Sequence, residues 1–148
     1  MSKLRPGWSL EGQYRLKIGP HLVVSFQRTH QVKGGEEITL PPKSYGTAPL
    51  VALGETRQVH GEPECCVGVC VGEDEAIWLG LEPSAESIPC SLRVAVTEPT
   101  LIDAVSGTQW SDDLQKNPQN YLIVPPQRSL DGHCRRRRLS AVRSSSAF

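Results

Sequence analysis

The chain has 148 residues, a length at which one domain with one hydrophobic core is expected. Its formal charge of zero is unevenly distributed. Residues 1–134 carry all 16 acidic and 11 of the 16 basic residues, a formal charge of −5, whereas residues 135–148 carry five arginines and no acid. The mildly acidic body has no electrostatic reason to bind nucleic acid or an anionic membrane, so such binding would depend on the basic end.

Eight short apolar segments between turn-forming residues predict β-strands, because they are rich in valine, isoleucine, leucine and tyrosine. In chain order these segments are residues 13–18, 21–29, 37–40, 50–53, 66–71, 76–81, 91–97 and 119–124. Twelve prolines and thirteen glycines leave little room for long helices. Two weak helical candidates, residues 100–104 and 111–116, are each too short to organise a fold.

Alternation within two of these segments predicts which side chains are buried. In SLRVAV, residues 91–96, apolar side chains alternate with serine, arginine and alanine. We therefore expect one face to be buried and the other, which carries Arg93, to meet solvent. In residues 76–81 the same reasoning places Trp78 on the opposite face from Ile77 and Leu79, in the core or on a half-exposed sheet face.

The connections indicate antiparallel pairing. IGP, residues 18–20, is a tight turn that predicts a hairpin between the first two segments. GEDEA, residues 72–76, is a second turn, and the prolines of residues 40–49 place that stretch in a loop. We therefore expect an all-β fold, a single antiparallel sandwich or barrel-like domain over residues 1–132, followed by a disordered basic tail over residues 133–148.

The location is expected to be cytoplasmic, without a membrane partner. The N-terminal sequence lacks the apolar core of a signal peptide, and no segment approaches ~18 uninterrupted apolar residues. The five cysteines are an odd number without a secretory signal, which predicts reduced thiols rather than a disulfide framework.

The cysteine cluster CCVGVC, residues 65–70, does not match a structural zinc site, in which C-x2-C pairs recur. On one strand, Cys66 and Cys70 would share a face but stand about 13 Å apart, too far for one ion. Cysteine also behaves as a small buried hydrophobe. We therefore favour burial of the cluster and predict no metal and no cofactor.

Candidate functional residues are few. The chain lacks the G-x-S-x-G, Walker, H-E-x-x-H and G-x-G-x-x-G motifs, and no two of its histidines have a spacing that would place both on one ion. If the chain is an enzyme, its site is assembled from distant loops, with Asp131, His133 and His21 as catalytic candidates. Trp8 and Trp110 lie in predicted loops and are the candidates for ligand contact, because an indole can stack on a sugar or a base.

The basic end allows three functional interpretations. It could contact nucleic acid, serve as a localisation signal, or offer Ser140 to a kinase that prefers arginine upstream of serine. Each requires only an accessible, basic, disordered segment, so none is specific.

Four blocks carry a resemblance: residues 12–29 (GQYRLKIGPHLVVSFQRT), 76–81 (AIWLGL), 104–107 (AVSG) and 117–132 (NPQNYLIVPPQRSLDG). In these blocks and their order, the chain resembles an uncharacterised family of bacterial and fungal β-rich proteins over about residues 4–132. The resemblance implies a β-rich fold but no particular reaction, ligand or catalytic residue.

Two departures from that family concern the C-terminal part. The family has P-x-Q-x-W-L-D-G where this chain has PPQRSLDG, with Ser129 at the tryptophan position. After Gly132 the resemblance stops, whereas the family continues with a segment like V-R-Q-F-V-A-x-P-L. Residues 139–148 can be encoded by codons that, read one base later, give C-P-Q-F-V-A-A-P-L. We hypothesise that the tail is a frameshifted remnant, which coding DNA incompatible with that reading would contradict; the lost strands would leave a sheet edge open to self-association.

The leading expectation is a small, soluble, non-catalytic β-domain that binds or assembles with a protein or small-molecule partner. The first alternative is a small hydrolase-type enzyme. The second is a phospho-regulated or nucleic-acid-binding protein that acts through its tail, which requires the tail to be genuine.

Overall fold

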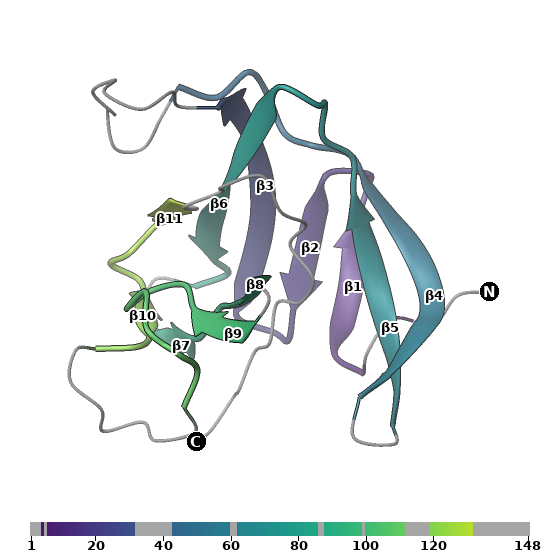
Figure 1. The fold of residues 1–148 in the computed structure, drawn as a ribbon. Coiled ribbons are helices and arrows are strands. Elements are labelled where there is room, and N and C mark those ends of the chain that lie inside the picture. Colours follow the sequence, from purple (N-terminus) through teal and green to yellow (C-terminus); the bar gives the residue numbers. More distant parts are fainter. Residues whose placement is uncertain are drawn as a thin grey trace.

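The structure, a computed structural model, describes residues 4, 6–31, 43–59, 62–85, 88–98, 100–111 and 119–131. Within the strands, the side chains of residues 54–59, 62–66, 96–98 and 131 are outside this description. The described residues form eleven β-strands and contain no helix (Figure 1). No described helix is therefore long and apolar enough to cross a membrane. The expected all-β fold is confirmed.

Five of the strands form one antiparallel sheet in the order β1-β2-β3-β6-β11. They are β1 (Trp8–Glu11), β2 (Arg15–Ile18), β3 (Leu22–His30), β6 (Glu75–Pro83) and β11 (Ser129–Asp131). The other six form antiparallel pairs: β4 (Leu50–Val59) with β5 (Glu62–Val69), β7 (Cys90–Leu92) with β10 (Leu122–Val124), and β8 (Ala95–Glu98) with β9 (Thr100–Asp103).

The turn between β2 and β3 forms as the sequence predicts. Ile18 pairs with Leu22 across it, and Gly19 has a φ of 60°, which glycine adopts without the steric cost of a side chain. The amide of Gly19 also donates to the carbonyl of Gly7, 2.7 Å away, so the turn is tied to the segment that enters β1. The antiparallel pairing of β2 with β3 across this turn confirms the predicted hairpin.

One hydrophobic core joins the sheets. Leu16, Val24 and Leu79, on one face of the five-stranded sheet, cluster with Leu92 of β7 and Val124 of β10, and all five are buried. The pairs β7–β10 and β4–β5 both contribute side chains to the core on the inner face of the large sheet, which makes the domain sandwich-like. Burial of these side chains is the main stabilising contribution to the fold.

The outer face of the five-stranded sheet carries polar side chains that bond to one another. Gln27 of β3 donates to Ser25 Oγ at 2.9 Å and accepts from Ser44 Oγ at 2.7 Å. A Cβ on Gly80 of the neighbouring strand would lie 2.5 Å from Ser25 Oγ, so the glycine accommodates this serine. Trp78 is half-buried on the same face, where the alternation of β6 predicted it.

Two sequence expectations for residues 91–104 are wrong. Residues 100–104 are not helical: Thr100–Asp103 is strand β9, which pairs with β8 on one edge, while its other edge is bonded through Trp110 N and Leu101 O. Residues 91–97 are not one strand with a solvent face, because β7 ends at Leu92, β8 begins at Ala95, and Arg93 between them is 4% exposed. Both expectations came from local sequence patterns. The observed strand β9 and the burial of Arg93 depend on partners from elsewhere in the chain, which a local pattern does not include.

Other expectations shift or lie outside the description. The segments expected as strands at residues 50–53 and 66–71 fall on the two strands of one hairpin, β4–β5, whose bounds differ from those expected. Strand β10 covers only the last part of residues 119–124. The turn at residues 72–76 is confirmed. The strand expected at residues 37–40, almost all of the helical candidate at 111–116, and the tail over 133–148 lie outside the described residues.

Candidate functional site

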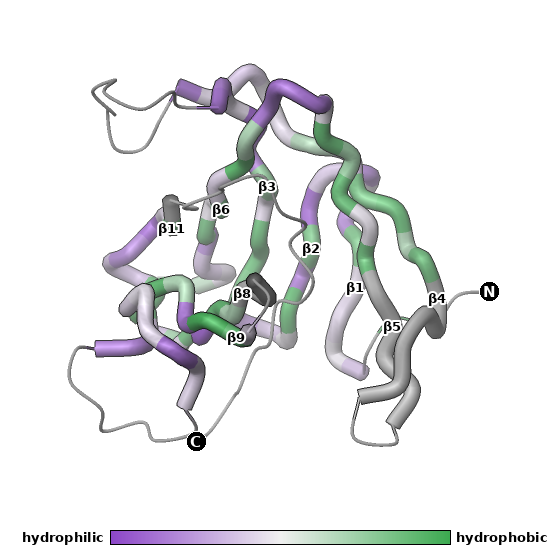
Figure 2. The backbone as a smooth tube through the Cα atoms, in the orientation of Figure 1, coloured by the Kyte–Doolittle hydropathy of each residue, from purple (hydrophilic) through white to green (hydrophobic). Residues whose placement is uncertain are grey.

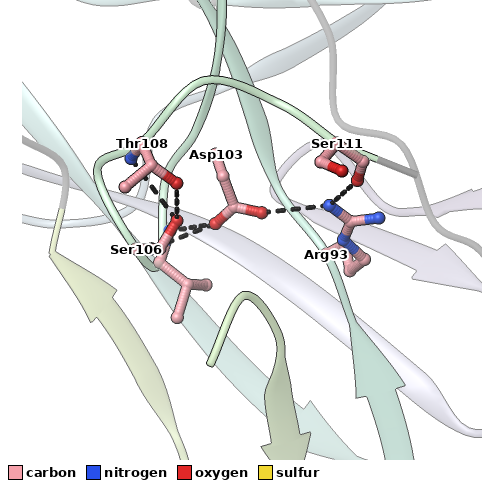
Figure 3. A network of polar contacts seen from close by, with 6 residues as sticks. Arg93, Asp103, Ser106, Thr108 and Ser111 are labelled. Atoms are coloured by element: carbon pink, nitrogen blue, oxygen red, sulfur yellow. Dashed lines mark hydrogen bonds and ion pairs between the residues drawn. The ribbon is translucent and has the colours of Figure 1, made fainter. Parts of the chain in front are cut away.

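A buried ion pair links the break between β7 and β8 to the end of β9. Arg93 Nη2 donates to Asp103 Oδ2 at 3.3 Å and to the backbone oxygen of Ser111 at 2.6 Å (Figure 3). Arg93 is 4% exposed and Asp103 is 1% exposed. A buried charge is tolerated when an opposite charge and hydrogen bonds compensate it, and Arg93 has both.

Asp103 also orders the turn that follows β9. Its Oδ1 accepts from the backbone N–H groups of Val105, at 2.9 Å, and Ser106, at 3.0 Å (Figure 3). Gly107 has a φ of 70° and donates to the carbonyl of Asp103, while the amide of Asp103 donates to the carbonyl of Thr108. An aspartate that bonds its own following backbone in this way is a common turn former. One carboxylate thus compensates a buried charge and closes a turn.

Trp110 is part of the same cluster. The Arg93 guanidinium carbon lies 3.8 Å from the centre of a Trp110 ring, which is cation–π geometry. The backbone amide of Trp110 donates to Leu101 O, so the residue is anchored to β9. Trp110 was a sequence candidate for ligand contact, and the structure assigns one face of its ring to an internal arginine.

These contacts indicate that the Arg93–Asp103–Trp110 cluster holds the loop after β9 against the rest of the domain. Both carboxylate oxygens of Asp103 already have partners, so the cluster offers no free base. The pair was not predicted from the sequence, because alternation placed Arg93 in solvent. The usable signals were a lone arginine within an apolar run and the turn-forming sequence DAVSG, which begins at Asp103.

The two described catalytic candidates lie far apart. The carbonyl of His21 accepts from Ser84 N, just beyond the end of β6, whereas Asp131 pairs with Trp78 near the middle of that strand. Six residues of strand separate the two positions, a distance of about 20 Å. The structure therefore does not bring His21 and Asp131 into one site.

Of the three remaining candidate functional residues, the structure describes only Trp8. Trp8 lies on β1 opposite Ile18, is half-buried and packs against the hydrophobic core. It is therefore part of a strand rather than a loop, and packing accounts for its position. His133 and Ser140 lie outside the described residues.

The cysteines differ in burial. Cys90 is half-buried and its thiol contacts Val124 O at 3.5 Å, whereas Cys70 is exposed, so the expectation of burial is wrong for Cys70. Cys70 lies just past the end of β5. No group of three or more histidine, cysteine, aspartate or glutamate residues in the described part of the chain is arranged to hold a metal ion.

Burial also raises the pKa of the Cys90 thiol, through desolvation of the thiolate. We expect Cys90 of the folded protein to react with iodoacetamide more slowly than Cys70 at about pH 8, because the thiolate is the reactive form and a raised pKa lowers its fraction. Peptide mass spectrometry after quenched labelling measures both rates. They should converge in denaturant, and a folded protein in which Cys90 reacts as fast as Cys70 would contradict this prediction.

The β4–β5 hairpin has apolar side chains on both faces. In its register Leu50 faces Val69 and Val51 faces Gly68. Residues opposite one another in an antiparallel pair project to the same side, so Leu50 and Val69 point inward, where they belong to or pack against the core. Val51 and Gly68 project to the other side, where Val51 is 48% exposed.

Leu53 extends this outward face. It lies at a β-bulge between Ala52 and Gly54, is 52% exposed, and its side chain covers Gly68, with Cδ1 3.3 Å from the position that a Cβ there would occupy. We call the exposed residues Val51, Leu53, Cys70 and Val71 the hairpin patch. Figure 2 shows hydrophobic residues along the described part of both strands.

No family model, no curated protein and no solved structure matches this chain. We therefore infer function from the chain's own surface. Within the described residues, other large apolar side chains such as Tyr14 and Ile88 are also exposed, but the hairpin patch combines exposed Val51 and Leu53 on one two-stranded hairpin.

Proposed function

We propose that the chain is a non-catalytic, cytoplasmic β-domain that binds a partner through the hairpin patch. The supporting observation is the exposure of Val51 and Leu53, at 48% and 52%, on a hairpin whose opposite face already covers the core. The free thiols of Cys70 and Cys90, together with the odd number of cysteines, support the cytoplasmic part of the proposal.

If solubility alone determined the sequence of the β4–β5 hairpin, its outward face would carry polar residues. A strand of an antiparallel sheet needs one apolar face for the core and usually alternates it with polar residues toward water. The outer face of the five-stranded sheet follows this rule with Ser25 and Gln27, whereas the outward face of the hairpin carries valine, leucine and a thiol. Exposed apolar patches on soluble proteins mark interaction sites.

The backbone of the hairpin also remains open to a partner. Among the described residues, β4 and β5 pair as strands only with each other, and Leu50 N adds one hydrogen bond to Gln13 O. A two-stranded sheet leaves peptide groups unpaired along its outer edges, where an extended segment can add its own hydrogen bonds. Apolar side chains and free peptide groups therefore lie together in this hairpin.

Peptide selection tests the proposal. Peptides selected from a displayed random library on the wild-type protein are expected to carry apolar residues at alternate positions. They should bind the Val51→Thr/Leu53→Thr variant at least about tenfold more weakly, because each half-exposed side chain contributes about 1 kcal/mol when buried. Fluorescence anisotropy with the selected peptides measures the affinities.

The matched control is Ile123→Thr, which alters an apolar side chain that is 39% exposed on β10, away from the hairpin. Its peptide affinities should equal those of the wild-type protein. Circular dichroism should show that all variants fold. Selected peptides that bind the double variant as tightly as the wild-type protein would refute the proposal.

A further inference from the structure

An acidic turn adjoins the hairpin patch. Glu73 and Asp74 follow Val71 after one glycine, Gly72, in the turn that leads to β6, and both are exposed. Because consecutive Cα atoms are about 3.8 Å apart, the Cα atoms of Val71 and Glu73 are within about 7 Å. The apolar patch therefore ends beside two negative charges.

The turn is held in place by contacts on both sides. Gln31, at the end of β3, donates through Nε2 to Glu73 O at 3.1 Å and through its backbone N to Asp74 O at 3.3 Å. Glu75 accepts from Gly72 N at 3.0 Å. These bonds hold the backbone of the turn from which the Glu73 and Asp74 side chains extend.

The charges of this turn are only partly compensated. Glu75 forms an ion pair with Arg28 at 3.5 Å, whereas Glu73 and Asp74 have no ion-pair partner among the described residues. Two net negative charges therefore remain beside the patch. A partner that covers the patch must bring this pair of charges close to its own surface, where opposite charge is favoured and like charge is penalised.

This charge decides between possible occupants. The whole chain has a formal charge of zero, but a second copy that docked through its own hairpin patch would bring the same acidic turn to the contact, so local electrostatics opposes that arrangement. Resting on the proposed function, we infer that the occupant is a separate protein segment in extended conformation, with apolar side chains at alternate positions and lysine or arginine directly beside them. The apolar residues cover Val51 and Leu53, and the basic residues face Glu73 and Asp74.

Three labelled synthetic peptides test this inference. They share an alternating valine–threonine core and end in two lysines, two glutamines or two glutamates. At low ionic strength the lysine peptide should bind about tenfold more tightly than the glutamate peptide, with the glutamine peptide between them. The differences should shrink in about 1 M salt, where the screening length falls to about 3 Å. Fluorescence anisotropy gives the three affinities.

Two charge variants localise the effect. Glu73→Gln/Asp74→Asn should remove most of the preference for lysine and leave the affinity of the glutamine peptide unchanged. Glu11→Gln/Glu82→Gln removes the same number of charges from the outer face of the five-stranded sheet, where both acids pair with Arg15, and should retain the preference.

Each outcome bears on one proposal. Equal affinities of the three peptides, with binding still dependent on Val51 and Leu53, would overturn this inference and leave the proposed function standing. Failure of all three peptides to bind would overturn both. Self-association of the wild-type protein in sedimentation velocity, abolished by Val51→Thr/Leu53→Thr, would identify a second copy as the occupant and also overturn the inference.

Discussion

Replacing Asp103 with alanine is expected to lower the free energy of unfolding by about 3–5 kcal/mol, because it leaves the charge of Arg93 buried without its counter-charge. The carboxylate also accepts hydrogen bonds from the Val105 and Ser106 amides and so stabilises the turn after β9; the substitution removes these bonds as well. Urea unfolding followed by circular dichroism measures the difference between the variant and the wild-type protein.

Two further variants separate the contributions of charge and turn. Asp103→Asn keeps an oxygen that can accept from the turn amides and loses only the negative charge, so it should destabilise the domain less than alanine. The double variant Arg93→Met/Asp103→Ala removes both charges and should be more stable than Asp103→Ala alone. If Asp103→Ala changes the free energy of unfolding by less than about 0.5 kcal/mol, the pair is not the anchor described above.

Replacing Leu92 with alanine is expected to lower the free energy of unfolding of the whole domain by about 2–5 kcal/mol. Leu92 is 1% exposed on β7, and its side chain belongs to the same core cluster as Leu16 and Val24 of the large sheet. The cost combines the lost burial with the cavity that remains. Thermal and urea unfolding, each monitored by two probes, provide the measurement.

This prediction also tests whether the sheets unfold together. Because Leu92 of β7 and Leu16 of the large sheet belong to one core cluster, Leu92→Ala and Leu16→Ala should both lower the midpoint of the same cooperative unfolding transition. The exposed control Ile123→Ala should change stability by less than about 0.5 kcal/mol. Two separate transitions, or a Leu92 variant as stable as the control, would show that the β7–β10 pair is not part of a common core.

The predictions that were confirmed depend on short-range information. The hairpin at residues 18–22 requires only a tight glycine-containing turn between two apolar segments. The placement of Trp78 on the opposite face of β6 from Ile77 and Leu79 requires only a period of two. Each of these two predictions uses information from only a few neighbouring residues, and the structure confirms both.

The predictions that failed involve residues whose surroundings come from elsewhere in the chain. Arg93 is buried because Asp103 and Trp110, ten and seventeen positions later, provide a counter-charge and an aromatic surface. Residues 100–103 are a strand because β8 lies along one edge. Neither partner is visible in a local pattern.

The candidate site shows the same division between sequence and tertiary structure. The apolar run that begins at Leu50 was sufficient to predict a strand. The exposure of Cys70, in contrast, could not be predicted from the residues around it. The amino-acid sequence by itself determined the all-β class, the antiparallel hairpin and the sites of turns, because side-chain alternation and turn chemistry act over a few residues. Only the tertiary structure decided which face of each strand is covered and which charge is buried, because burial depends on the elements that pack against a residue.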